Sequence, residues 1–317
     1  MTEFISGVAC GSIVVDLTIS TYSGRKKDKK TQREVTDAHG SGSKKAASVY
    51  KSLFAECKEL DDINKYCAVV RASHYRLTKP WSDMGSRVLP TALLLEYGDV
   101  MSKHDEEFTT LVNVFLDRVD TLISNAAFQL GSLFDRNEYP TREQLRGKFG
   151  IYRAMAPLPT SGDWRLDLDS DKQRELVEAY EKRFNDQMQK AQMDNWNQLY
   201  KALRLFSVKL TDNVDEATGA SKPKKLYESM IESAHDLCSL LPSLNLTGDA
   251  SMEKARVQLE GIIDGLTIKD LRKSEGTRIL TKQKVDAVLS AFDWGDLNDD
   301  DEAGVDGVEL HGEGGDE

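Results

Sequence analysis

The sequence predicts a mainly α-helical fold in which long helices form an antiparallel bundle with a small β element. Two observations predict the helices: apolar residues recur every three or four positions over residues 105–133 and again over residues 170–210, which is the period of an amphipathic helix. A third predicts the β element, because apolar and polar residues alternate over residues 12–20 and 164–169. At 317 residues, 39% of them hydrophobic, the chain is long enough to bury such a core.

The first element is a half-buried strand over residues 12–20. Its aliphatic side chains fall on every second position, as in a strand with one buried face: Ile13, Val15, Leu17 and Ile19. A basic segment follows, with nine Lys or Arg and three acidic residues between Tyr22 and Lys51. Because this segment also holds a Gly/Ser stretch from His39 to Ser43, we expect a flexible basic loop after the strand.

A helical period begins at Lys44, with Ser43 placed to cap the helix, and ends near Lys79-Pro80. The apolar residues of this stripe are Ala46, Val49, Tyr50, Leu53, Cys57, Leu60, Ile63, Cys67 and Val70. The wide apolar stripe over residues 105–133 requires a partner helix. After it, Thr141-Arg142-Glu143-Gln144 forms a capping box, and the helix that it opens is short because Gly147 and Gly150 follow.

The remaining long helix spans residues 170–210 and follows the second predicted strand at residues 164–169. We expect the two strands to pair with each other or with a further hairpin, since isolated strands are unstable. A helix of 40 residues is about 60 Å long, which exceeds the diameter of a compact domain. The helix therefore either bends around residues 194–197 or packs antiparallel against the helix at residues 105–133.

These elements predict four parts of the chain. Residues 1–210 form a helical domain with the small β element, and residues 211–223 form a polar linker. Residues 224–292 form a small helical region, with helices at about 224–241, 250–264 and 281–292. Residues 293–317 form a disordered acidic tail, because they hold 11 acidic residues and no Lys or Arg, which repel one another and offer little apolar surface to bury. The rest of the chain is neutral, with 42 acidic and 42 basic residues.

The sequence lacks the motifs of known enzyme and metal sites. Gly40-Ser41-Gly42-Ser43-Lys44-Lys45 does not meet the spacing of a phosphate-binding loop, and Asp296-x-Asn298-x-Asp300 departs from a calcium loop at its glycine and glutamate positions. The four cysteines form no C-x-x-C pair. We therefore expect no enzyme, cofactor or metal site, and reduced thiols. Without a signal peptide or an apolar run of 18 residues, we expect a cytoplasmic protein that does not enter a membrane.

The candidate binding residues lie in the basic segment. Clustered cations beside an aromatic residue suit contact with a nucleic-acid backbone, and the residues of this candidate site are Tyr22, Arg25, Lys26, Lys27, Lys29 and Lys30. The alternatives are a solvated loop or a docking surface for the protein's own acidic tail. A second basic segment at residues 269–284 is less specific, because surface helices often have this composition.

Two parts of the sequence resemble known proteins. Leu17-x-Ile19-x-x-Tyr22-Ser23-Gly24-Arg25-Lys26-Lys27 resembles the start of a family of uncharacterised proteins from bacteriophages and mobile elements. Tyr139-Pro140, Phe149, Pro157-Leu158-Pro159 and Gly162-Asp163-Trp164-Arg165 are similar to a middle segment of the same group. The resemblance covers roughly residues 12–210, and it implies a role related to DNA, since genes of this group often lie near those for replication and recombination.

The acidic C-terminus is similar to the tails of single-stranded DNA-binding proteins. Such a tail competes with DNA for the basic groove and recruits replication partners. This chain departs from the pattern, because its aromatic residues Phe292 and Trp294 stand at the beginning of the tail and not at its end.

These observations together favour a non-enzymatic phage protein of DNA metabolism, located in the host cytoplasm. We expect it to bind single-stranded DNA through the basic segment, with an autoinhibitory tail that also contacts phage or host replication and recombination proteins. We also expect the chain to associate with further copies of itself. The alternative is a structural, assembly or protein-interaction protein of the phage that assembles through its long helices and makes no contact with nucleic acid.

Overall fold

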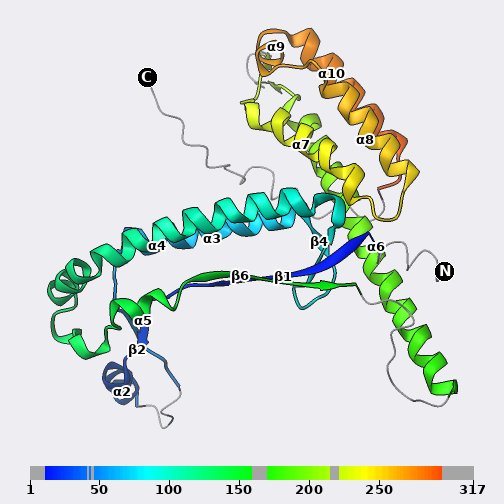
Figure 1. The fold of residues 1–317 in the computed structure, drawn as a ribbon. Coiled ribbons are helices and arrows are strands. Elements are labelled where there is room, and N and C mark those ends of the chain that lie inside the picture. Colours follow the sequence, from blue (N-terminus) through cyan, green and yellow to red (C-terminus); the bar gives the residue numbers. More distant parts are fainter. Residues whose placement is uncertain (1–10, 41–42, 44–45, 159–169, 215–220, 295–317) are drawn as a thin grey trace. The chain divides into compact units, whose positions relative to one another are not determined.

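The computed structural model describes residues 11–40, 43, 46–158, 170–214 and 221–294. It is mainly α-helical with a small antiparallel sheet, which confirms the predicted fold class (Figure 1). The helices are α2 (Lys29–Ala38), α3 (Lys58–Leu77), α4 (Leu94–Leu130), α5 (Arg142–Arg146), α6 (Ser170–Lys209), α7 (Glu228–Leu244), α8 (Ala250–Ile263), α9 (Ile268–Lys273) and α10 (Glu275–Ala291). The strands are β1 (Ser12–Ser20), β2 (Arg25–Lys27), β3 (Tyr50–Ser52), β4 (Lys79–Pro80), β5 (Arg87–Pro90), β6 (Gly150–Pro157), β7 (Asn213–Val214) and β8 (Ser221–Lys222).

The chain folds into two compact units, and each contains segments that are distant in the sequence. Unit 1 comprises residues 1–14, 78–93 and 157–317, and unit 2 comprises residues 15–77 and 94–156. The predicted boundaries at residues 210 and 224 do not coincide with this division. The physical reason is that α6 shares one hydrophobic core with the helices that follow it, so residues 211–223 do not separate two independent regions.

Unit 2 is built on the helix pair α3 and α4. Glu59, near the start of α3, pairs with Arg118 in the second half of α4. Arg76, near the end of α3, pairs with Glu96 at the start of α4, at 3.2 Å. The two helices are therefore antiparallel. Their facing apolar residues form the core of the unit: Ile63, Cys67, Phe108, Val112, Phe115 and Val119.

The helix that we predicted from Lys44 begins only at Lys58, so the earlier start and the Ser43 cap are wrong. Residues 50–52 instead form β3, whose backbone pairs with β2. The chain then turns through Glu56, which adopts a left-handed φ of 55°, and buries Leu53 and Phe54 in the core of unit 2. The apolar spacing before residue 58 thus comes from a turn that enters the core and not from a helical face.

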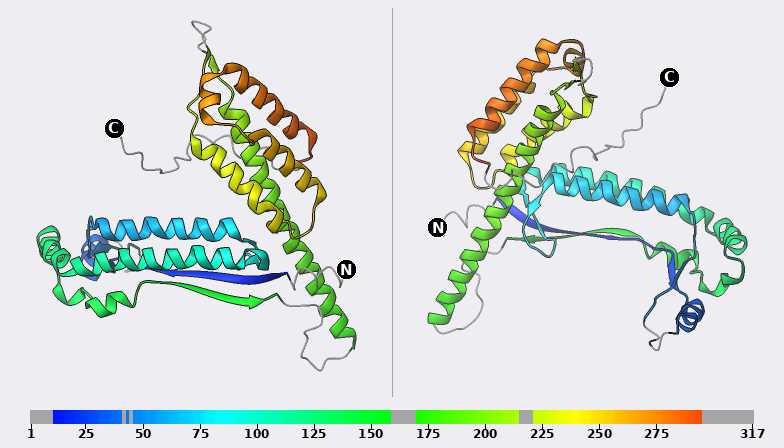
Figure 2. Two further views of the ribbon diagram at one scale, coloured as in Figure 1. Left: turned by 45° about the horizontal axis from the view of Figure 1, so that its top comes forward. Right: turned by 180° about the vertical axis from the view of Figure 1, so that it is seen from behind.

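A four-stranded sheet has the order β4-β5-β1-β6. Strand β1 confirms the prediction for residues 12–20, and its neighbours are β5 and β6. The predicted strand at residues 164–169 lies outside the described residues, and β6 is a strand that the sequence analysis missed. In unit 2, α3 and α4 lie over one face of β1 and β6 (Figure 2), and Ile19 and Ile151 pack from these strands against the helices.

In unit 1, α6 is one continuous helix of 40 residues, as its apolar stripe predicts. Its predicted partner was the helix at residues 105–133, but that segment belongs to α4 in unit 2. Along α6, Phe184 and Met188 pack with Trp81 and Val88. Further on, its C-terminal half packs with α7, α8 and α10 around a core that includes Leu199, Leu203, Phe206, Cys238, Leu259 and Val285. Helix α6 therefore contributes side chains to two hydrophobic clusters along its length.

The short helices follow their local signals. Thr141 and Gln144 form the predicted capping box of α5, and Gly147 ends that helix. Two features differ from the prediction: helix α9, capped by Thr267, and the first part of α10, capped by Ser274, lie outside the predicted helix ranges. Of the helices that the structure describes, none combines the length and apolar character needed to span a membrane.

Candidate nucleic-acid interface

The basic segment after β1 is ordered by backbone pairing. Gly24 takes a left-handed φ of 64°, and its carbonyl oxygen accepts a hydrogen bond from the Leu53 amide at 2.7 Å. The chain then forms β2, which pairs antiparallel with β3. We call this pair, residues 25–27 and 50–52, the basic ribbon. The predicted flexible loop at residues 25–30 is therefore corrected to a strand followed by the first turn of a helix.

That helix is α2, and Asp28 caps its N-terminus. The Asp28 carboxylate accepts hydrogen bonds from the amides of Lys30, at 2.9 Å, and Thr31, at 3.1 Å. The bond from Thr31 is the main cause that lowers the pKa of Asp28. Lys29 and Lys30 occupy the first turn, which contains no acidic residue. Because a helix N-terminus is already positive, these lysines add to a local field that favours anions.

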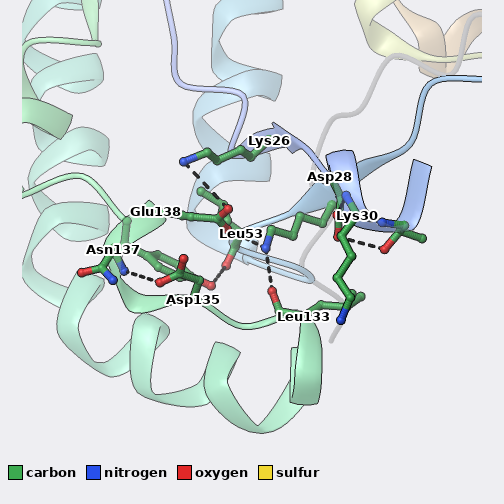
Figure 3. A network of polar contacts seen from close by, with 11 residues as sticks. Lys26, Asp28, Lys30, Leu53, Leu133, Asp135, Asn137 and Glu138 are labelled. Atoms are coloured by element: carbon green, nitrogen blue, oxygen red, sulfur yellow. Dashed lines mark hydrogen bonds and ion pairs between the residues drawn. The ribbon is translucent and has the colours of Figure 1, made fainter. Parts of the chain in front are cut away.

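One face of the basic ribbon is partly neutralised by an acidic side chain. Lys26 lies directly opposite Lys51, and Glu138 approaches both: its carboxylate is 2.6 Å from Lys51 Nζ and 3.9 Å from Lys26 Nζ (Figure 3). Lys51 Nζ also donates to the Leu133 carbonyl oxygen at 2.6 Å. Lys51 is thus an anchor that holds the ribbon to the segment after α4, and Lys26 shares its counter-ion.

The other face of the ribbon is basic and open. Alternate residues of a strand share a face, so Arg25 and Lys27 point away from Lys26. Lys27 lies directly opposite Tyr50, whose side chain is 60% exposed. Arg25 and Lys27 are exposed as well, and among the described residues neither has an acidic partner within ion-pair distance. An aromatic ring and two cations that lack an acidic partner in the described part of the chain therefore share one surface.

The segment after α4 fixes the position of this ribbon. Tyr139 donates its hydroxyl hydrogen to the Leu53 carbonyl oxygen at 2.8 Å, next to the end of β3 (Figure 3). The Tyr139 ring packs edge-on against Phe54, with 5.4 Å between ring centroids. Asp135 accepts a hydrogen bond from the Asn137 amide at 2.9 Å and shapes the turn that presents Glu138. The ribbon is consequently attached to the core of unit 2 on the face that contacts Glu138.

The structure separates the six predicted site residues. Arg25, Lys27, Lys29 and Lys30 are exposed, whereas Lys26 faces Glu138. Tyr22 is half-buried, packs against Phe54 at 6.2 Å between ring centroids, and has a pKa raised by burial.

The sequence analysis missed Tyr50, which it had placed on a helical apolar stripe. Its position across from a lysine depends on β2–β3 pairing, for which three-residue strands give little sequence signal.

In the second basic segment, residues 269–284, three of the six cations make contacts within unit 1. Arg278 donates from Nε and Nη2 to the two carboxylate oxygens of Asp212, at 3.1 and 2.9 Å, and Arg272 donates to the Leu226 carbonyl oxygen at 2.6 Å. Lys282 pairs with Asp286 at 2.5 Å. These cations are engaged within unit 1, which leaves the basic ribbon as the better candidate.

Within the described part of the chain, no group of three His, Cys, Asp or Glu side chains is arranged to hold a metal ion. Cys57, Cys67 and Cys238 are free and buried, and burial raises the pKa of Cys57 and of Cys238 to about 11. These thiols are therefore protonated at neutral pH and poorly nucleophilic. Comparison of the chain with protein families, with curated proteins and with solved structures finds no match.

Proposed function

We propose that this chain is a non-enzymatic protein that binds single-stranded DNA through the open face of the basic ribbon and the first turn of α2. The observation that carries the proposal is the shared surface of Arg25, Lys27 and the exposed Tyr50, followed directly by Lys29 and Lys30. Cations contact the phosphates, and an exposed ring stacks on a base. The Glu138 contacts support the proposal, because they hold the ribbon while leaving these cations free.

A single strand fits this surface better than a duplex does. Stacking on Tyr50 requires a base that is not already paired and stacked within a helix. The resemblance of residues 12–210 to phage proteins supports a role in replication or recombination. The acidic tail supplies a competitor for the same cations, because a tethered polyanion has a high effective concentration near its own chain.

Replacing Lys27, Lys29 and Lys30 together with Ala is expected to flatten the salt dependence of single-stranded DNA binding. The log-log slope of affinity against salt falls by about 0.7 for each phosphate contact that is lost, so the triple variant should lose about 2. The measurement is a fluorescence-anisotropy titration with a labelled oligonucleotide at several salt concentrations.

The control for this experiment removes the same charge elsewhere. Lys182, Lys201 and Lys254 are exposed lysines of unit 1 outside the second basic segment, and their triple replacement with Ala should leave the slope unchanged. Lys26→Ala should have a small effect, because Lys26 faces Glu138. Equal slopes for the two triple variants would reject the ribbon as the binding surface. Absence of binding at low salt, even without the tail, would favour the structural or assembly protein.

Tyr50→Ala is expected to weaken single-stranded DNA binding by about 1 to 3 kcal/mol, the range for loss of one stacked base, without changing the salt slope. Tyr50→Phe keeps the ring and should bind nearly as well as the natural chain. The same titration measures both variants. A changed slope for Tyr50→Ala, or equal loss in both variants, would show that Tyr50 acts through ribbon folding or its hydroxyl group.

A further inference from the structure

Strand β6 is an edge strand of the four-stranded sheet. It ends the sheet order β4-β5-β1-β6, so no described strand pairs with its outer backbone groups. Its eight residues, Gly-Ile-Tyr-Arg-Ala-Met-Ala-Pro, are mostly apolar. Tyr152 is 57% exposed and Met155 48%. A row of unpaired amides and carbonyls on such a strand is a template for pairing with another chain.

The first seven residues of β6 hold neither a lysine nor a proline, and the one proline of the strand, Pro157, stands at its C-terminal end. Proteins block such edges with outward lysines, prolines, bulges or very short strands. The single charged residue of β6 is Arg153, and it bonds to Asp105 of α4 with distances of 3.3 and 2.5 Å. This cation is therefore satisfied within unit 2. Arg153 would therefore repel an identical strand only in a register that places it directly opposite its own copy.

We propose that β6 pairs antiparallel with β6 of a second copy of this chain. A twofold axis perpendicular to the sheet relates two such edges and keeps the same residues on the same face in both copies. Arg153 and Ile151 face α3 and α4, so Tyr152, Ala154 and Ala156 share the opposite face. The result is one continuous sheet with the helices of both copies on one side.

The side chains of β6 select the register of this pair. If the axis passed through Arg153, two arginines would lie directly opposite each other, which is destabilising. If it passes through Ala154, this alanine lies opposite its own copy, Arg153 lies opposite Met155, and Tyr152 lies opposite Ala156. The second arrangement separates the cations and places the large Tyr152 ring beside a small side chain.

The expected association is weak and depends on protein concentration. One pair of short strands covers less surface than the roughly 1,200 to 2,000 Å² of a typical stable interface. The contact is therefore expected to form in the micromolar range and to strengthen where many copies gather. This inference does not rest on DNA binding.

A disulfide test distinguishes this register from other contacts. In a chain with Cys10 replaced by Ser, and with Cys57, Cys67 and Cys238 buried, Ala154→Cys should cross-link two copies rapidly on mild oxidation. Directly opposite Cα atoms lie about 4.5 to 5.5 Å apart, which a disulfide can span. Ala156→Cys is the matched control, because its copy would lie about 13 Å away along the strand. Equal cross-linking of the two variants, or none, would overturn the proposal.

Sedimentation velocity gives the second measurement. Ala154→Lys places two ammonium groups opposite each other at the axis and should abolish the dimer, whereas Ala156→Lys should weaken it less. Both alanines are exposed, so circular dichroism should show an unchanged fold. A natural chain that stays monomeric throughout the micromolar range would refute pairing between copies. A dimer that persists in Ala154→Lys would place the contact elsewhere.

Discussion

Asp194→Asn is expected to lower the free energy of unfolding by about 3 to 5 kcal/mol, the range for breaking a buried ion pair from one side. Its partner Lys79 is 0% exposed, and Lys79 Nζ lies 3.0 Å from Asp194 Oδ2. Without the carboxylate, unit 1 must bury an uncompensated ammonium or release its proton. Urea unfolding of the natural chain and the variant at pH 7 measures the loss.

The pH dependence of this loss has a definite sign. Burial lowers the pKa of Lys79 below its ordinary value, and Asp194 opposes that shift. The unfolded chain therefore binds the lysine proton more tightly than the folded chain, so stability rises with pH toward the unfolded pKa of about 10.4. Asp194→Asn removes the opposing charge, and its stability should recover more steeply between about pH 7 and pH 10.

An exposed pair provides the control for Asp194→Asn. Lys190 and Asp83 also lie in unit 1, 2.9 Å apart, but their side chains are 60% and 90% exposed. Asp83→Asn should leave the urea unfolding curve nearly unchanged, because exposed ion pairs contribute little to stability. Lys79→Met combined with Asp194→Asn should restore most of the stability, since no buried charge remains. A cost below about 1 kcal/mol for Asp194→Asn alone would show that water reaches Lys79.

Periodicity predicted the elements of this fold better than their partners. The apolar stripes of α4 and α6 were visible in the sequence, and so was the alternation of β1. A stripe shows that a helix face is buried but does not say against which element. Phe115 of α4 packs in a core with α3, whereas Phe206 of α6 packs with α7, α8 and α10. The chain enters each unit more than once, and no local pattern encodes that order.

The candidate site shows a similar limit. The cluster of cations was evident from composition. Its division into two faces depends on the pairing of β2 with β3, in which Lys26 lies opposite Lys51, 25 residues later in the chain. That pairing turns Lys26 toward Glu138 and places Tyr50 beside Lys27. Tyr50 fitted a helical period equally well, because its spacing from Leu53 suits both structures. Only the long-range contact distinguishes a core residue from an exposed ring.

The beginning of the acidic tail also differs from its prediction. Trp294 lies within residues 293–317 but is only 6% exposed. Its ring packs against Trp196, at 5.3 Å between centroids, and Tyr200, at 5.4 Å. Its Nε1 donates to the Leu289 carbonyl oxygen at 2.7 Å. The folded part of unit 1 therefore extends to Trp294, and residues 295–317 lie outside the described residues.

Two truncations are expected to separate packing from charge. Removing residues 293–317 deletes Trp294 and should cost about 3 kcal/mol, the lower end of the range for losing a buried tryptophan, because this terminal segment can detach without unfolding α10. Removing residues 295–317 keeps the ring and should leave urea unfolding unchanged. This shorter deletion removes 10 of the 11 tail acids, so at low salt it should tighten single-stranded DNA binding, which competition by the tail otherwise weakens.

Trp294→Ala in the full-length chain tests the packing effect without changing the charge. It should reproduce the stability loss of the longer truncation and leave the salt dependence of DNA binding as it is. Equal stability of the two truncated chains would mean that the ring contributes no net packing energy. The truncated chain lacking residues 295–317 is compared with the full-length chain at each salt concentration. If the two bind DNA with equal affinity throughout, the tail does not compete for the basic ribbon, because a competing polyanion weakens binding at low salt and loses this effect as salt screens it.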